Sequence, residues 1–351
     1  MMKIVGCRRR LTIVLLLTLL AGGLLGYAVY DYHRFLDTPL AVPATGAEFT
    51  IATGESIRTI AYRLQEQGVL RSSLYWQAYA RLKGLTHRVK AGEYLLKPDT
   101  TPRTLLEQFV AGRVIQYPLT IVEGWTFRQL LQATAGHPKL KQTLTGLDDA
   151  AIMARLGYPQ QHPEGRFFPD TYSFPAGTSD VDFLKRAYVT LEQRLEEAWE
   201  QRSAGLPLRN PYEALILASI IEKETARPEE RREIAGVFVR RLQRGMLLQT
   251  DPSVIYGLGE RFDGNLHRQD LRTDTPYNTY TRPGLPPTPI ALPGAASIEA
   301  AVRPAQGDSL YFVATGAGAH AFSRTMEEHN QKVRQYQLQP QGLKLKAQDS
   351  R

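Results

Sequence analysis

The most constraining feature of the sequence is the stretch Asn210–Gly245, which predicts two helices separated by a proline. Asn210 suits an N-cap, and Pro211 suits the first helical position. Because the residue before a proline resists helical geometry, the first helix should end near Arg227. Pro228 should then begin the second helix, and Gly245 should end it. The stretch therefore predicts a pair of consecutive helices against which the rest of the domain packs.

The first of these helices carries two glutamates. At about 100° per residue, its isoleucines, leucines and alanines fall on one apolar arc of roughly 200°. Glu224 lies near the middle of this arc, whereas Glu222 lies about 160° away, beside Ser219 and Lys223. A carboxyl group on an apolar face loses solvation, which raises its pKa and suits it to donate a proton. The alternative, that Glu224 lies past the last buried turn and is solvated, is equally compatible with these angular positions around the helix.

Composition excludes several classes of function. At 351 residues, with 43% hydrophobic and 22% charged residues, the chain has room for two globular domains. The net charge is +8, and no dense cluster of Lys and Arg with interleaved aromatics indicates a nucleic-acid partner. The single cysteine, Cys7, excludes an intrachain disulfide and a cysteine-rich zinc site. Since the seven histidines show no H-E-x-x-H spacing, we expect no metal and no other cofactor.

The N-terminus predicts a single membrane anchor. Residues 1–10 are basic, and residues 11–30 carry no charge over about the 20 residues that cross a bilayer. Basic residues before a span predict a cytoplasmic N-terminus and an extracytoplasmic remainder. A cleaved signal peptide is the alternative, but the apolar run is long for a signal core and no clear A-x-A cleavage site follows it. We therefore expect a retained transmembrane helix at residues 11–30.

The remainder predicts an α+β protein with two extracytoplasmic parts. Residues 31–47 predict a polar, proline-bearing tether. Residues 48–119 predict a strand, two helices capped by Ser56 and Ser73, a second strand and a linking helix. This β-α-α-β order resembles a LysM-type glycan-binding module; a small packing domain that binds nothing is the alternative. Residues 120–337 predict a larger, mixed α+β domain, followed by a flexible tail at residues 338–351.

Two stretches of the larger domain predict irregular structure. Residues 163–178 are rich in aromatics, prolines and turn formers, which predicts an irregular wall rather than a regular element. Such aromatics could bind sugar rings or enclose a core. Five prolines in Pro283–Pro293 predict a rigid, extended surface. Long irregular segments inside a folded domain are often functional, so the polar residues in the loops after Gly245 are candidate site residues.

Several long motifs occur in a fixed order along the chain. They are EGRFFPDTY, LASIIEKET, VFVRRLQRGMLLQTDPSVIYG, YNTYTRPGLPP, ALPGAAS and FVATGAGAHAFS. Together they resemble the endolytic murein transglycosylase family (MltG, also called YceG-like) over nearly the whole chain. Two positions in the proline-rich loop depart from the pattern. Thr288 stands where the family often has Gly, and Leu292 where it often has Asn.

The resemblance implies an enzyme of the bacterial inner (plasma) membrane that cuts nascent peptidoglycan strands outside the cytoplasm. It would cleave the β-1,4 bond between MurNAc and GlcNAc without hydrolysis, leave a 1,6-anhydro-MurNAc end and so terminate strand elongation. The family motif implies Glu224 as general acid and base, with Glu222 as the alternative. Further residues would bind sugar hydroxyl and N-acetyl groups: Gln249, Asp251, Tyr256, Asn278, Tyr280 and His320. Glycan strands and peptidoglycan synthases are the implied partners.

One carboxyl group is enough for this chemistry. A hydrolytic glycosidase normally needs two carboxylates that flank the scissile bond. A lytic transglycosylase can use one, because the sugar's own 6-hydroxyl replaces water as the nucleophile and has a high effective concentration. The alternative function is a non-catalytic peptidoglycan-binding scaffold at the cell-wall synthesis machinery, which a cleavage assay on glycan strands would distinguish.

Overall fold

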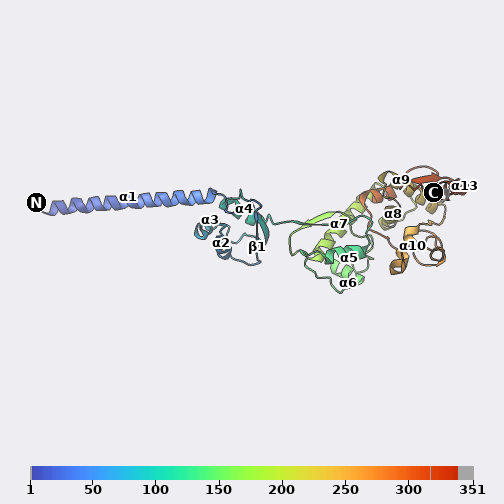
Figure 1. The fold of residues 1–351 in the computed structure, drawn as a ribbon, viewed down its shortest axis with the longest axis horizontal. Helices are drawn as coiled ribbons and strands as arrows, with labels where there is room; N and C mark the ends of the chain where they lie inside the picture. Colours follow the sequence, from blue (N-terminus) through green and yellow to red (C-terminus); the bar gives the residue numbers. More distant parts are fainter. Residues whose placement is uncertain (1, 317, 339–351) are drawn as a thin grey trace, which may run out of the picture. The chain divides into compact units, whose positions relative to one another are not determined.

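The computed structural model describes residues 2–316 and 318–338, with side chains from residue 13 onward and up to residue 337. The side chains of the predicted basic segment at residues 1–10 and the predicted tail at residues 338–351 therefore lie outside the described part. The chain divides into two compact units, Met1–Tyr117 and Pro118–Arg351 (Figure 1). The motifs that carry the family resemblance all fall in the second unit.

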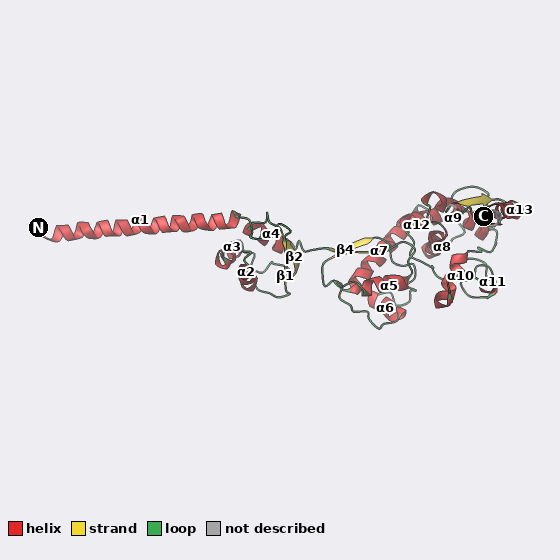
Figure 2. Cartoon of the chain, viewed as in Figure 1, coloured by secondary structure: helices red, strands yellow, loops and turns green. Residues whose placement is uncertain are grey.

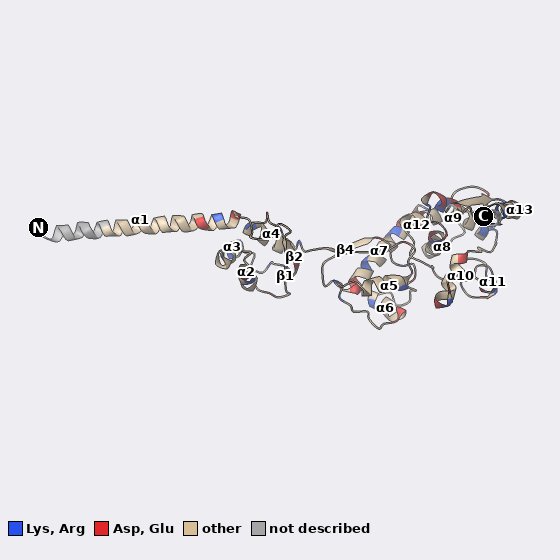
Figure 3. Ribbon diagram, in the orientation of Figure 1, with Lys and Arg blue, Asp and Glu red and all other residues tan. Residues whose placement is uncertain are grey.

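The first unit begins with one long helix, α1 (Met2–Asp37). By length and composition, its part from Ile13 to Asp37 is apolar enough to cross a membrane, with a mean hydropathy of 2.1. From Ile13 onward, the helix carries no charged residue before its last turns (Figure 3). The helix continues beyond Tyr30, where the sequence predicts a tether, because Phe35 and Leu36 are buried in the core of the first unit.

The rest of the first unit has the predicted β-α-α-β order. Its elements are β1 (Ala47–Ile51), α2 (Ile57–Glu66), α3 (Ser73–Leu82), β2 (Gly92–Leu96) and the linking helix α4 (Pro102–Ala111). β1 and β2 pair antiparallel, with Phe49 opposite Tyr94. Ser56 caps α2 as predicted, whereas the cap of α3 is Ser72, one residue before the predicted one.

The second unit is mixed α and β, with many helices and short strands (Figure 2). Before the central helices it has β3 (Tyr117–Thr120), α5 (Phe127–Ala135), α6 (Asp149–Leu156), β4 (Thr171–Phe174) and α7 (Asp180–Glu200). The central pair is α8 (Pro211–Glu224) and α9 (Pro228–Gln243). After it come α10 (Asp251–Leu258), a 3-10 turn at Gly259–Arg261, α11 (Arg268–Arg272), α12 (Ala295–Val302), β5 (Tyr311–Ala314), β6 (His320–Ser323), α13 (Met326–Val333) and a π-helical turn at Arg334–Leu338. β3 pairs with β4, and β5 pairs antiparallel with β6.

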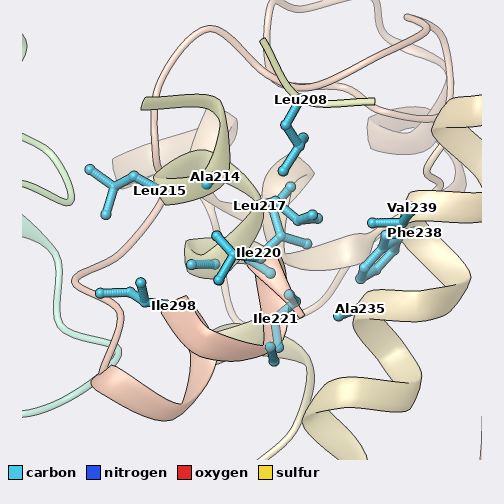
Figure 4. Close-up of a cluster of buried hydrophobic side chains, with 14 of the residues drawn as sticks. Leu208, Ala214, Leu215, Leu217, Ile220, Ile221, Ala235, Phe238, Val239 and Ile298 are labelled. Carbon is cyan, nitrogen blue, oxygen red and sulfur yellow. The ribbon is translucent and has the colours of Figure 1, made fainter. Parts of the chain in front are cut away.

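Helix α8 is the centre of this unit, and every residue from Ala214 to Ile221 is buried. Its apolar side chains pack against α9 and α12, as Figure 4 shows for Ile220, Phe238 and Ile298. Part of the more polar side of α8 is buried too. Ser219 is fully covered, and its hydroxyl accepts a hydrogen bond from the Ile290 main chain at 3.0 Å. Distant segments therefore pack on the apolar arc and also on part of the more polar side, where Lys223 remains exposed.

Each of the two stretches predicted to be irregular differs from its prediction in one respect, the first in regularity and the second in burial. Residues 163–178 contain a regular strand, β4, and the side chains of Phe167, Phe168 and Phe174 are buried. These aromatics therefore enclose a core rather than offer faces to sugar rings. The proline-rich loop is non-helical as predicted, but residues 288–294 lie inside the fold and not on its surface.

Candidate active site

Glu224 is the last residue of α8, at the point where the helix stops. The helix ends before Arg227 because Thr225 adopts an extended backbone, with φ −144° and ψ 137°. Glu224 as a whole is partly buried, with its carboxyl group turned inward to accept a hydrogen bond from the hydroxyl of Thr250. Since Thr250 is itself buried, this carboxyl group lies in a desolvated position rather than in solvent.

The electrostatic surroundings of Glu224 favour its protonated form. Burial raises the pKa of Glu224 to about 7, and the nearby Asp251 acts in the same direction. The hydrogen bond from Thr250 and the charges of His320 and Arg241 act against them. A carboxyl group that titrates near neutral pH can both give and recover a proton under physiological conditions.

Helix α10 brings two polar residues to Glu224. Thr250 is the residue before this helix and Asp251 is its first residue. The hydroxyl of Tyr280 donates to Asp251 Oδ1 at 2.5 Å. Two of the predicted substrate-binding residues, Asp251 and Tyr280, therefore lie together at the catalytic candidate.

Helix α9 contributes a buried cation that the sequence reasoning missed. Arg241 donates to the main-chain oxygens of Leu310 and Leu248 at 2.7 and 2.8 Å, and to Gln249 Oε1 at 3.4 Å. Gln249 itself has a positive φ of 51°, so this turn is held in a conformation that few side chains adopt. The signal was an arginine inside the apolar run VFVRRL of α9.

His320, on β6, is oriented by a carboxylate that was also missed. Glu230 accepts hydrogen bonds from the main-chain N–H of His320 at 2.9 Å and lies 2.7 Å from His320 Nδ1. Burial opposes ionisation of Glu230, but the hydrogen bonds from His320 outweigh it and hold the pKa of Glu230 below its usual value. The Thr225 hydroxyl is 3.4 Å from Glu230, which places the pair beside the C-terminal end of α8.

The structure places Tyr256 at a second buried carboxyl group, that of Glu164. The Tyr256 hydroxyl donates to Glu164 Oε2 at 3.1 Å, and the N–H of Phe127 donates to Glu164 Oε1 at 2.9 Å. Burial raises the pKa of Glu164 to about 7. This carboxyl group joins the start of α5 to α10, and EGRFFPDTY was its sequence signal.

Asn278 is engaged inside its own loop. Its Nδ2 donates to the main-chain oxygens of Thr273 and Asp270 at 2.7 and 3.0 Å, and its Oδ1 accepts from the Tyr280 N–H at 2.9 Å. Because the side chain is buried, these bonds shape the loop that presents Tyr280. Asn278 therefore lies behind the site rather than on its face.

Glu222 has a different environment from Glu224. Its side chain is only 6% exposed and lies 3.2 Å from Arg231 Nη2, while Oε2 accepts the N–H of Gly294 at 2.9 Å. Arg231 also lies 3.6 Å from Glu123. A Cβ atom at Gly294 would lie 1.8 Å from Glu123 Oε1, so a glycine is needed unless Glu123 moves. Glu222 thus holds three segments together.

The two departures from the family pattern lie in the buried half of the proline-rich loop. The hydroxyl of Thr288 lies 2.8 Å from the Tyr277 hydroxyl and donates to the oxygen of Pro289 at 2.8 Å. Leu292 is fully buried, and its main chain exchanges hydrogen bonds with Gly124 and Trp125. Both side chains are thus accommodated inside the fold.

No group of three or more His, Cys, Asp or Glu that could hold a metal occurs within the described part of the chain.

Known proteins resemble this chain over most of its length. Residues 49–335 match the model of the YceG-like family. The endolytic murein transglycosylase of Bacillus subtilis is 32% identical over 309 residues, which are 83% of this chain and 85% of that protein. The protein of the same name from Streptococcus pneumoniae is 29% identical to this chain. The match covers 93% of this chain and 64% of the Streptococcus pneumoniae protein.

A solved structure supports the same relationship. The crystal structure of a YceG-like protein from Listeria monocytogenes matches with a TM-score of 0.54 and 32% identity, over 82% of this chain and 99% of that one. The long ordered motifs, the family match and the shared fold agree, and the chain belongs to the YceG-like family.

Proposed function

We propose that the chain is a peptidoglycan lytic transglycosylase with Glu224 as its general acid and base. The observation that carries this proposal is the desolvated carboxyl group of Glu224, whose pKa is raised to about 7 at the end of a buried helix. The names of the relatives, endolytic murein transglycosylases, support the same reaction. Glu222 is engaged by Arg231 and Gly294, which favours Glu224 over it.

The reaction proceeds with one proton that leaves Glu224 and one that returns. Protonated Glu224 gives its proton to the GlcNAc 4-oxygen as the bond between this oxygen and MurNAc C1 breaks. The resulting carboxylate takes the proton of the MurNAc 6-hydroxyl, whose oxygen forms the new bond to C1. The products are a free GlcNAc 4-hydroxyl and a 1,6-anhydro-MurNAc end, and Glu224 is again protonated. Because the nucleophile belongs to the substrate, no water is consumed.

The surrounding residues are proposed to hold the glycan. Gln249, Tyr280 and His320 belong to the loops and strand around Glu224 and can bind sugar hydroxyl and N-acetyl groups. Asn278 and Tyr256 shape these loops from behind. Mass spectrometry of purified glycan strands after digestion tests the function. Anhydro ends support it, whereas binding without cleavage would support the scaffold alternative.

We propose that α1 anchors the chain in the inner membrane of a bacterium, with the N-terminus in the cytoplasm. Its apolar part supports an anchor, and the basic residues before it support this orientation. The strands that synthases extend at the membrane are then the proposed substrate, and the synthases are proposed partners. To test the orientation, a reporter enzyme that is active only outside the cytoplasm is fused after Arg351. We expect this fusion to be active. Activity of a cytoplasm-only reporter at this position would contradict the orientation.

We further propose that the β-α-α-β part of the first unit is a LysM-like module that contributes glycan affinity rather than chemistry. A cavity of about 340 Å³ lies between the loop after β1 and the loop before β2, and Ser56, Thr86 and Ala91 are among its lining residues. Its lining combines the hydroxyl-bearing Ser56 and Thr86 with apolar residues such as Ile57 and Val89, which suits a sugar ring.

Filling this cavity should weaken binding to sacculi. Ala91→Trp is expected to lower the affinity of the full chain for purified sacculi about tenfold, a loss of about 1.4 kcal/mol. The rate of cleavage at saturating substrate should be unchanged. Leu82→Trp is the matched control, since Leu82 is 78% exposed and does not line the cavity. Equal sacculus binding by both variants and the original chain would favour a packing domain.

A further inference from the structure

Asp251 is a carboxylate at the active site that the proposed reaction does not need as acid or base. We propose that Asp251 is a second catalytic residue, whose negative charge stabilises the positive charge that develops on the sugar ring as the glycosidic bond breaks. This inference rests on the proposed function of the same site. It assigns Asp251 a role in the transition state, beyond the binding of sugar hydroxyls.

Asp251 lies close enough to Glu224 to act on the pKa of its carboxyl group. Thr250 contacts the carboxyl group of Glu224, and Asp251 is the next residue. Since consecutive Cα atoms are about 3.8 Å apart, the Cα atom of Asp251 lies about this distance from that of Thr250, the residue that contacts Glu224. Asp251 is exposed, whereas the carboxyl group of Glu224 is turned inward. An incoming glycan can therefore reach Asp251 while Glu224 acts on the bond from the buried side.

Tyr280 holds the carboxylate of Asp251 in one direction. Its hydroxyl donates to Asp251 Oδ1 at 2.5 Å, and the loop that carries Tyr280 is held in turn by the buried Asn278. Asp251 also occupies the first position of α10, where Pro252 follows and fixes the backbone. A charge that is fixed before the reaction needs no reorganisation when the positive charge develops, which is what makes such groups effective.

In the part of the chain that the structure describes, Asp251, Arg241 and His320 act on Glu224, while Glu230 contacts His320 and the neutral Tyr280 contacts Asp251. Arg241 lies on α9 and His320 on β6, so both act on Glu224 from elements other than α8 and α10. The transition state of glycosidic cleavage resembles an oxocarbenium ion, which a fixed carboxylate stabilises. Asp251 forms no bond and takes no proton, so the proton transfers by Glu224 and the bonds made and broken are unchanged.

The test separates a transition-state role from substrate binding. Asp251→Asn keeps the shape but removes the charge, and kcat on purified glycan strands should fall about 10²–10³-fold while KM stays within about threefold. Because Asp251 raises the pKa of Glu224, the loss of activity on the alkaline side should move to lower pH in this variant. A rise of KM with unchanged kcat would assign Asp251 to binding and overturn the inference.

Three further variants complete the experiment. Asp251→Glu keeps the charge and should recover part of kcat, which a purely structural role would not predict. Tyr280→Phe keeps the carboxylate but removes its hydrogen bond, and should cost about tenfold in kcat. Asp274→Asn is the control, because Asp274 is exposed and pairs with Arg282 in the neighbouring loop. A kcat of Asp251→Asn within threefold of the original enzyme overturns the inference.

The products distinguish the two proposals. If the unaltered chain gives reducing ends or no cleavage, the lytic transglycosylase function fails regardless of Asp251. If it gives anhydro ends and Asp251→Asn gives them at the same rate, only the role of Asp251 fails. Loss of kcat in Asp251→Asn, with anhydro ends from the residual activity and an unchanged melting temperature, supports both.

Discussion

Glu224→Gln is expected to abolish the formation of anhydro ends while the protein stays folded. Glutamine keeps the shape of the side chain and can still accept the hydrogen bond from Thr250. It cannot give a proton to the leaving oxygen or take one from the 6-hydroxyl. General acid–base help is typically worth about 10²–10⁴ in rate, and one residue serves both half-reactions here, so the loss should lie at or beyond the upper end. Mass spectrometry of digested glycan strands measures it.

The same variant should show a characteristic pH dependence of stability. The pKa of Glu224 is raised from its ordinary value of 4.5 to about 7 in the folded protein. Between these values the folded state binds more protons than the unfolded state, so stability falls as pH rises through this window. Gln cannot ionise and avoids this loss. Its melting temperature should match that of the original chain near pH 4 and exceed it near pH 8. The corresponding gain in the free energy of unfolding near pH 8 is at most about 3 kcal/mol.

Glu222→Gln is the matched control, because it makes the same chemical change two residues upstream. We expect this variant to retain most of its cleavage, since Glu222 is held by Arg231 and Gly294 and does not contact the Thr250 hydroxyl that marks the site. Full cleavage by Glu224→Gln would rule out the assignment. Loss of cleavage in a folded Glu222→Gln alone would move the catalytic role to Glu222.

Of the variants proposed for this protein, Arg231→Met is expected to lower the free energy of unfolding most, by about 3–5 kcal/mol. Such a loss is typical when one partner of a buried ion pair is removed. The two side chains of the Arg231–Glu222 pair are only 10% and 6% exposed. Without the arginine, the carboxylate of Glu222 stays buried and keeps the hydrogen bond from the Gly294 N–H, but it loses the positive charge beside it. Glu123, whose pKa is already raised by burial and by Glu222, would also lose a nearby positive charge.

Chemical denaturation of the chain without residues 1–30 measures this effect. The double variant Glu222→Gln/Arg231→Met should lose clearly less than the sum of the two single variants, because it leaves no unpaired charge. Its residual cleavage also reports whether the pair matters only for folding. A loss below about 1 kcal/mol in Arg231→Met would mean that water or a rearranged Glu123 compensates the charge.

Local structure followed from the sequence where the signals are local. Asn210 caps α8, Pro211 and Pro228 occupy the first positions of α8 and α9, and Gly245 has the positive φ of a helix stop. The β-α-α-β order of the first unit was predicted in the same way. Capping, proline geometry and hydrophobic spacing depend on residues within a few positions of each other, so one chain is enough to recognise them.

Burial and pairing depend on which distant segments meet, and there the tertiary structure decided. The side of α8 that carries Ser219 and Glu222 is the more polar one, but the proline-rich loop and Arg231 of α9 pack against it. A motif contains Glu164 and an apolar run contains Arg241, but neither pattern shows which group the side chain contacts, since the partners of Glu164, Arg241 and Glu230 lie many residues away. The motif and the apolar arc singled out Glu224 from the sequence alone. Its desolvation required Thr250 and the start of α10, because only packing from a separate helix can exclude water from the end of α8.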